Sequence, residues 1–124
     1  MGCTSLTSAN LGKGITTITY NMFDNCTSLK NINIPSGVTE IQTNAFLRCK
    51  SLTSIDIPET ITNIQERAFD DCSLHKVYCY ATTPPTVKSN SFDELRALYV
   101  PNKCKAKYEA STWKHIYNEI VEME

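Results

Sequence analysis

The feature that most constrains this chain is a repeat of constant length that covers most of the sequence. Cysteines mark the repeat, because they recur at one fixed interval as Cys3, Cys26, Cys49 and Cys72. The segments 26–48 and 49–71 align without gaps and are identical at 11 of 23 positions. A fixed period of about 20 to 50 residues marks a solenoid, in which each repeat forms one coil that stacks on the next. The sequence therefore predicts a repeat solenoid.

The repeat sets the expected boundaries along the chain. Coils are expected at about 3–25, 26–48, 49–71 and 72–94, followed by a final strand at 95–101. The fourth coil starts one residue short and returns to register at Val87. After residue 101 the repeat stops, and we expect a helical cap over 102–124, with Asn102 and Ser111 each capping a helix. The second helix would bury Trp113, Ile116, Tyr117 and Ile120. With 124 residues, one domain is expected.

The residues of one coil predict its path. In the third coil, Ile55 and Ile57 alternate with Asp56, which predicts a β-strand with the isoleucines inward and the aspartate outward. Pro58 ends this strand because proline cannot donate the next ladder hydrogen bond. Parallel strands are expected at 6–11, 29–34, 52–57, 74–79 and 95–100. One phenylalanine per coil should form a stacked aromatic spine, made of Phe23, Phe46, Phe69 and Phe92.

The coil motif resembles that of the BspA-type leucine-rich repeats of bacterial surface proteins. The resemblance rests on Cys49-x-Ser-Leu52-Thr-Ser-Ile55-x-Ile57-Pro58, on Ile64-x-x-x-Ala68-Phe69-x-x-Cys72, and on the ending from Tyr99-Val100-Pro101 through Trp113 to Ile120. It implies a leucine-rich-repeat solenoid, mostly β within the broad α/β class, with right-handed parallel β coils and a C-terminal helical cap. It also implies an adhesion or protein-interaction module on the cell surface or outside the cell. Where the family usually has glycine, this chain has Thr19, Gln42, Gln65 and Lys88.

Six cysteines in 124 residues invite a search for metal sites and disulfides. The repeated cysteines suit a ladder of small buried thiols. The run Cys72-x-x-His75-x-x-x-Cys79, with Cys104 as a fourth residue, has spacing similar to that of zinc ligands. His75 should however point outward and Cys79 inward, so we expect no metal. Cys79 and Cys104 stay open as a disulfide pair.

Composition and motifs argue against several functional classes. A net charge of −1 and an isoelectric point near 6.1 offer no basic surface to nucleic acid. No apolar run approaches the roughly 18 residues of a membrane span, so no membrane insertion is expected. The sequence has no glycine-rich phosphate loop, nucleophile elbow or paired-carboxylate motif. We expect no enzyme activity and no cofactor.

What remains is a binding surface on the outward positions of the strands. The early coils present small polar residues there, whereas the last two present tyrosine and basic residues. The predicted ligand-binding residues are Asn31, Asn33, Ser54, Asp56, His75, Lys76, Tyr78, Arg96 and Tyr99, and Ala97 should face outward beside them. Tyrosine and arginine are enriched at binding hot spots, although tyrosine also simply fits strands well. Tyr20 and the edge formed by Gln42 and Gln65 are the next surface to consider.

Three functions stay open: binding of a protein partner, such as a host surface or matrix protein; binding of a glycan; and a structural spacer. The N-terminal end adds an expectation about assembly. Met1 and Gly2 directly precede Cys3, so no cap covers the first coil and Leu6 and Leu11 should be exposed. Because open strand edges invite pairing, we expect a fragment of a longer array that can self-associate through this coil.

Overall fold

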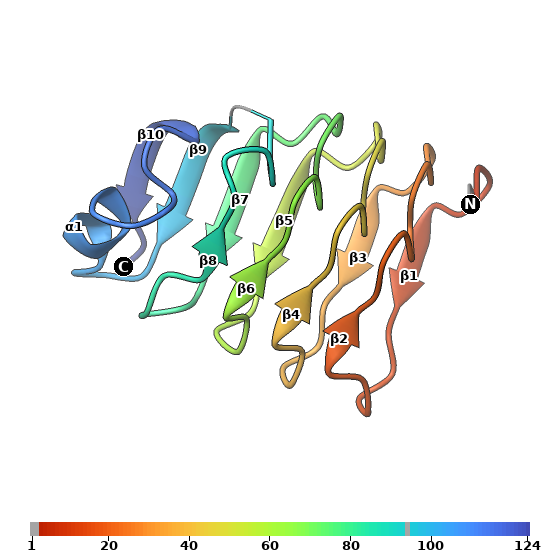
Figure 1. Ribbon diagram of the computed structural model, residues 1–124, viewed down its shortest axis with the longest axis horizontal. Helices are drawn as coiled ribbons and strands as arrows, with labels where there is room; N and C mark the ends of the chain where they lie inside the picture. Colours follow the sequence, from red (N-terminus) through yellow and green to blue (C-terminus); the bar gives the residue numbers. More distant parts are fainter. Residues whose placement is uncertain (1–2, 94) are drawn as a thin grey trace.

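The chain forms a parallel β-solenoid of about five turns with a short helix near its C-terminal end (Figure 1). The computed structural model describes residues 3–93 and 95–124, so that Met1 and Gly2 lie outside the described residues. Longer strands line one side: β1 (Ser8–Asn10), β3 (Asn31–Asn33), β5 (Ser54–Ile57), β7 (Lys76–Cys79) and β9 (Leu95–Val100). Shorter strands line the other: β2 (Thr17–Ile18), β4 (Glu40–Ile41), β6 (Asn63–Ile64) and β8 (Thr86–Val87). The predicted strand positions are confirmed.

The sequence period appears in the structure as strand register. Ile18 lies opposite Ile41, and Ile41 lies opposite Ile64, in parallel pairing. On the other side of the coil, Asn10 lies opposite Asn33. Paired residues in a parallel ladder are side by side. Equal coil lengths therefore place equivalent side chains in straight rows along the solenoid.

The two rows of strands differ in continuity. The shorter strands form one unbroken sheet in the order β2-β4-β6-β8. On the long side, β1 pairs with β3, and β5, β7 and β9 pair in turn, but the described residues show no ladder pairing between β3 and β5. The outer face of the longer strands is consequently divided at this point.

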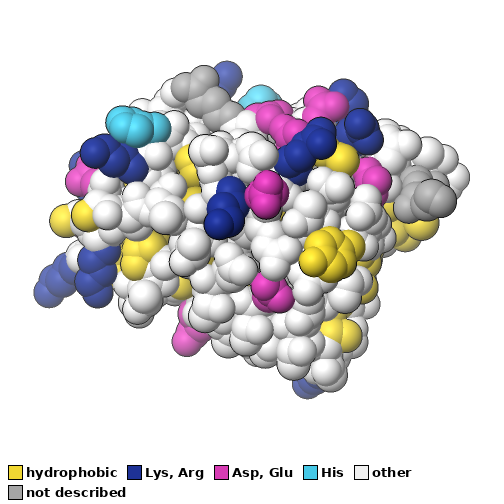
Figure 2. All heavy atoms as spheres, in the orientation of Figure 1, with side chains coloured by type: hydrophobic (Ala, Val, Ile, Leu, Met, Phe, Trp, Pro, Cys, Tyr) yellow, Lys and Arg dark blue, Asp and Glu magenta, His cyan; other side chains and the backbone are white. Residues whose placement is uncertain are grey.

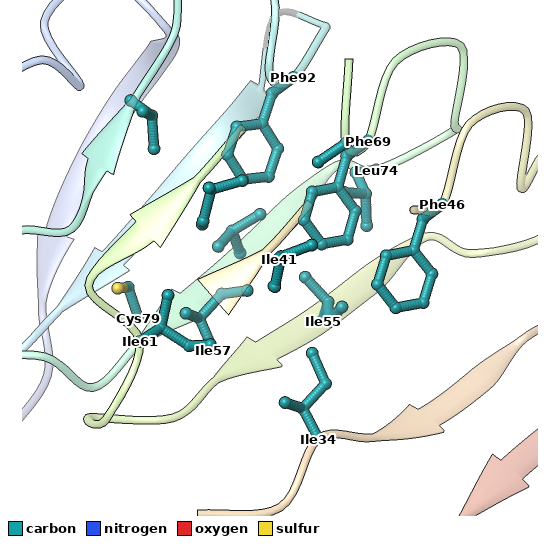
Figure 3. Close-up of a cluster of buried hydrophobic side chains, with 14 of the residues drawn as sticks. Ile34, Ile41, Phe46, Ile55, Ile57, Ile61, Phe69, Leu74, Cys79 and Phe92 are labelled. Carbon is teal, nitrogen blue, oxygen red and sulfur yellow. The ribbon is translucent and has the colours of Figure 1, made fainter. Parts of the chain in front are cut away.

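An aromatic stack runs through the centre of the solenoid, as predicted. The ring centroids of Phe46 and Phe69 are 4.9 Å apart, with an angle of 7° between the ring planes. Those of Phe69 and Phe92 are also 4.9 Å apart, with an interplanar angle of 3°. Phe23 continues the stack at 5.2 Å from Phe46. Figure 3 shows the rings of Phe46, Phe69 and Phe92 in a row above the inward isoleucines of the longer strands, including Ile55. The stack repeats at nearly the spacing of about 4.8 Å between adjacent strands, so the rings and the backbone share one period.

Two of the four turns that lack the family's usual glycine, those at Gln42 and Gln65, are held by side-chain hydrogen bonds between coils. The Gln42 side-chain oxygen accepts from the Tyr20 amide at 3.2 Å, and the Gln65 oxygen accepts from the Thr43 amide at 3.1 Å. The Gln65 amide nitrogen donates in turn to Glu40 at 2.7 Å. Gln42 and Gln65 thus join neighbouring coils, which occupies the polar groups of this edge.

The fourth coil departs from the repeat in the way its sequence predicts. Cys79 pairs with Ile57, and Val87 pairs with Ile64. The sequence separation between the paired residues is therefore one residue larger in the second pair than in the first. The chain between β7 and β8, residues 80–85, is therefore one residue longer than the equivalent 58–62. This extra residue compensates for the short start of the coil.

The cap differs from its prediction in its second half. Helix α1 (Lys105–Glu109) confirms the first predicted helix, but its N-cap is Cys104 rather than Asn102, with no side-chain capping bond. The second predicted helix is wrong: residues 117–122 form strand β10 (Tyr117–Glu122), which pairs in parallel with β9. His115 takes a left-handed conformation with φ of 72° and turns the chain toward β9. A helix would satisfy its own backbone groups but leave the edge of β9 unpaired, whereas strand β10 pairs with that edge, and this outweighs the helical spacing of the apolar residues.

Trp113 and Tyr108 nevertheless close the end of the core. The Trp113 ring packs 5.2 Å from Phe92 and extends the aromatic stack beyond the last phenylalanine. Its indole nitrogen donates to the Pro85 carbonyl at 3.0 Å. The Tyr108 hydroxyl contacts the Cys79 sulfur at 3.3 Å. Both cap residues are fully buried, so the last coil is covered by side chains with satisfied polar groups.

All six cysteines are free thiols, including Cys79 and Cys104, which the sequence left open as a disulfide. Two thiols of the ladder donate across coils: Cys49 to the Phe23 carbonyl at 3.2 Å, and Cys72 to the Phe46 carbonyl at 2.9 Å. His75 is exposed while Cys79 is buried, as the predicted register requires. Burial raises the pKa of the Cys79 thiol, which keeps it protonated.

Removal of one ring from the stack should strongly destabilise the solenoid. Phe69→Ala is expected to lower the free energy of unfolding by about 3–5 kcal/mol, because a cavity opens between Phe46 and Phe92. Urea denaturation checks this, with Tyr20→Ala, at a side chain 63% exposed, as a control expected to stay within about 0.5 kcal/mol. A loss below about 1 kcal/mol for Phe69→Ala would show that the stack is misassigned.

The indole hydrogen bond of the cap gives a second expectation. Trp113→Phe keeps an aromatic ring against Phe92 but leaves the buried Pro85 carbonyl without its donor. We expect a loss of about 1–3 kcal/mol in the free energy of unfolding, measured by urea denaturation. Lys114→Ala, on an exposed neighbour, serves as the control. Equal stability of Trp113→Phe and the unmodified chain would contradict this role of the indole.

Thiol reactivity tests the cysteine ladder. The thiolate is the reactive form, so burial should protect Cys79, while the exposed Cys3 should react first with N-ethylmaleimide. Mass spectrometry of the alkylated native chain is expected to find Cys3 labelled and Cys26, Cys49, Cys79 and Cys104 unlabelled until urea is added. Rapid native labelling of Cys79 would overturn this burial.

Candidate functional site

The outward side chains of the longer strands form two parallel rows, because register aligns equivalent positions. The first row is Ser8, Asn31, Ser54, Lys76, Ala97 and Glu119, and the second is Asn10, Asn33, Asp56, Tyr78, Tyr99 and Val121. From β3 to β5, which are not paired, equivalent positions are related by the sequence repeat alone. All nine predicted ligand-binding residues lie on this outer face or at the turns that lead into it. Seven are exposed, and Tyr78 and Tyr99 are half-buried.

One outward residue behaves differently from its prediction. Ala97 was expected to be exposed, but it is buried, with only 4% of the residue's surface exposed to solvent. It does not belong to the hydrophobic core cluster. Its strand partners are Lys76 on β7 and Glu119 on β10, so Ala97 is flanked by a paired strand on both sides. The strand β10, which the sequence did not reveal, is thus the reason for the error.

The predicted residues fall into two groups, divided where the sheet is interrupted. Between β3 and β5 lies a hollow of about 240 Å³, lined by Asn31, Asn33, Ser54 and Asp56. The Asn33 amide also reaches Asn10 of the preceding coil, at 3.4 Å. Amide, hydroxyl and carboxylate groups here converge on one space and can form hydrogen bonds with a polar ligand.

The second group is aromatic and basic. The rings of Tyr78 and Tyr99 stack with centroids 4.5 Å apart and an interplanar angle of 17°. His75 is exposed just before β7, Lys76 is exposed at the start of β7, and Arg96 is exposed near the start of β9. The stack places a rigid apolar surface with two phenol groups beside cationic side chains. Such a surface suits contact with another macromolecule, because it buries area at a small entropic cost.

The shorter strands lie on the opposite side of the solenoid. Figure 2 views the molecule with the shorter strands in front, and shows charged side chains of both signs mixed among uncharged ones. The ion pairs among the described residues are Arg48 with Asp24 at 3.8 Å, Lys50 with Asp71 at 3.3 Å, and Arg67 with Asp70 at 3.0 Å. Exposed pairs add little stability, but they occupy these groups.

Tyr80 follows the end of β7, is 44% exposed, and was not among the residues predicted from the sequence. The register contains a signal for it. Because Cys79 aligns with Ile57, Tyr80 occupies the position of Pro58 in the preceding coil. Because Tyr78 aligns with Tyr99, the same position in the next coil is Pro101. Burial raises the pKa of Tyr80, and the nearby charges of Asp56 and Tyr78 add to the rise.

The described residues contain no group of three or more histidine, cysteine or acidic side chains arranged to hold a metal. Within the same residues, no helix has the length and apolar character needed to cross a membrane.

The family of the chain follows from comparison with known proteins. No curated protein matches the chain. Among solved structures, it is similar to a leucine-rich cell surface protein from Faecalibacterium prausnitzii, with 15% sequence identity and a TM-score of 0.36. The match covers 96% of this chain, which spans 60% of that protein's length. The model of the BspA-type leucine-rich repeat region matches residues 1–99. With that match over most of its length, the chain belongs to the BspA-type leucine-rich repeat family.

Proposed function

We propose that this chain is a protein-binding module of a bacterial cell-surface or secreted protein, and that it binds through the outer face of its longer strands. The observation that carries the proposal is the stacked pair of Tyr78 and Tyr99 on that face. Tyrosine and arginine dominate binding hot spots, where a rigid ring buries area and the polar group still finds a partner. The pair lies next to the exposed Lys76 and Arg96.

Family membership supports the cellular location, since the BspA-type repeats that this chain resembles occur in bacterial surface proteins. The same membership supports a non-catalytic role. The net charge of −1 gives nucleic acid no favourable electrostatic surface. A host surface or matrix protein is the partner class proposed.

A glycan is the second candidate ligand, and the hollow between β3 and β5 favours it. Asn31, Asn33, Ser54 and Asp56 line about 240 Å³ with hydrogen-bonding groups that suit sugar hydroxyls. This hollow and the tyrosine stack lie on the same face, so separate variants are needed to distinguish the two ligands.

The test measures binding to immobilised matrix proteins and to a glycan array in parallel. Tyr78→Ala and Tyr99→Ala should each weaken binding to a protein ligand by about 2 kcal/mol or more, as hot-spot residues do. The free energy of unfolding should fall only by about 0.5–1.5 kcal/mol, the value of an aromatic pair. Tyr20→Ala, an exposed tyrosine away from this face, is the matched control and should bind normally.

Normal protein binding by both tyrosine variants would remove this face from consideration. Binding to glycans alone, lost in Asn33→Ala and Asp56→Ala but retained in Tyr78→Ala, would replace the protein proposal with the glycan one. No binding in either assay would leave a structural spacer.

A further inference from the structure

The strongest departure from the repeat is the turn of the fourth coil after β7. Residues 80–85 form a link one residue longer than 58–62 in the third coil, as the registers of Cys79 with Ile57 and of Val87 with Ile64 show. In a solenoid, the repeated positions serve stacking. A local violation of an otherwise consistent pattern is where a functional site is expected.

Tyr80 begins this link at the position of Pro58 and Pro101 in the neighbouring coils. Its amide donates to the Ile57 carbonyl at 3.0 Å, a bond that a proline could not form. The backbone therefore keeps its place in the stack while the side chain projects. Tyr80 is one of three large hydrophobic side chains that remain exposed among the described residues.

Hollows lie on both sides of the Tyr80 side chain. One, of about 350 Å³, is lined by Ile61, Thr82 and Pro84 among others. The other, of about 310 Å³, is lined by Pro101, Asn102, Met123 and Glu124. Tyr80 and Glu59 line both hollows, so the ring stands between them as a ridge with a carboxylate beside it.

The charged side chains that line the two hollows on either side of this ridge have one sign. Glu59 and Glu124 are the charged residues that line the hollows, and no described lysine or arginine lines either one. Lys107 lies nearby, but its ammonium group is directed to the Thr82 carbonyl at 3.5 Å. Asp56 adds a further negative charge that acts on the Tyr80 phenol. An anionic ligand would be repelled here, whereas a cation would gain both from the carboxylates and from the face of the ring.

We propose that the hollows beside Tyr80 form a second binding site, which accepts a lysine or arginine side chain of a partner polypeptide. The cationic group would lie over the Tyr80 ring next to Glu59. Its aliphatic stem would contact the apolar lining, such as Ile61 and Pro84, as long basic side chains commonly do. Space on both sides of the ridge admits the neighbouring residues of the partner chain. The site does not depend on the tyrosine stack of the outer face.

Nuclear magnetic resonance titration of the full chain with blocked glycine pentapeptides tests the proposal. The central residue is lysine, arginine, norleucine or glutamate. The lysine and arginine peptides should give saturable shifts at Glu59, Tyr80 and Asn102 that weaken with added salt. The norleucine peptide should bind more weakly and the glutamate peptide not at all. Absence of saturable shifts with lysine and arginine, or equal affinity for lysine and norleucine, would overturn the proposal.

Variants separate the ring from its surroundings. Tyr80→Leu should weaken lysine-peptide binding by roughly twofold to thirtyfold, the range of cation–π contacts, whereas Tyr80→Phe should retain it because the ring face is kept. Glu59→Gln should reduce both the affinity and its salt dependence. Tyr20→Leu is the matched control for an exposed tyrosine. Full affinity in Tyr80→Leu, with a native spectrum, would refute the site.

Discussion

The structure depends on stacking between coils, because no single coil can bury its own apolar side chains. Backbone amides at the turns bond across coils, from Phe23 to Ala45 at 2.8 Å and from Phe46 to Ala68 at 2.7 Å. The phenylalanine rings stack at 4.9–5.2 Å in the same direction. Both interactions require nearly the same spacing, about that of adjacent β-strands, so each reinforces the other. Trp113 ends the series by packing on Phe92, which removes the last ring from solvent.

Stacking also determines which positions can vary. An inward residue such as Ile57 must fit its neighbours in two adjacent coils, so its chemistry is nearly fixed. An outward residue contacts only its row, and substitution there changes the surface without changing the scaffold. The row that runs through Asn33, Asp56 and Tyr78 illustrates this, since it passes from amide to carboxylate to aromatic over three coils. The proposed functions use such variable positions and the irregular link that begins at Tyr80.

The repeat made most of the fold predictable, including the strands, the aromatic stack and the buried thiols of Cys26 and Cys49, because each prediction needed only the alignment of coils. Of the other repeated cysteines, Cys72 is half-buried and Cys3, in the first coil, is exposed. The errors arose where the repeat stops. Trp113, Ile116 and Ile120 have helical spacing, yet Tyr117–Glu122 forms a strand that pairs with β9. The apolar pattern of this segment contains no information about the unpaired edge of β9, so the sequence alone could not predict the strand. Burial of Ala97 followed from that same strand. The interruption between β3 and β5 has no evident sequence signal. Tyr80 had one, the replacement of a strand-ending proline, which becomes visible once the register of the fourth coil is known.

Native-state hydrogen exchange of the spine amides tests most directly whether stacking between coils governs this fold. The Phe46 amide bonds to the Ala68 carbonyl of the next coil at 2.7 Å, and the Phe69 amide bonds to the Ser91 carbonyl at 2.7 Å. Neither residue belongs to a strand, because Phe46 lies in a turn and Phe69 forms an isolated bridge with Phe92. If the coils are stable only as a stack, these amides should exchange only through unfolding of the whole array. The free energy of opening derived from their exchange rates should then equal the free energy of unfolding measured by urea denaturation. Exchange of the Phe46 or Phe69 amide at the rate of an exposed turn, while the strand amides stay protected, would contradict the account.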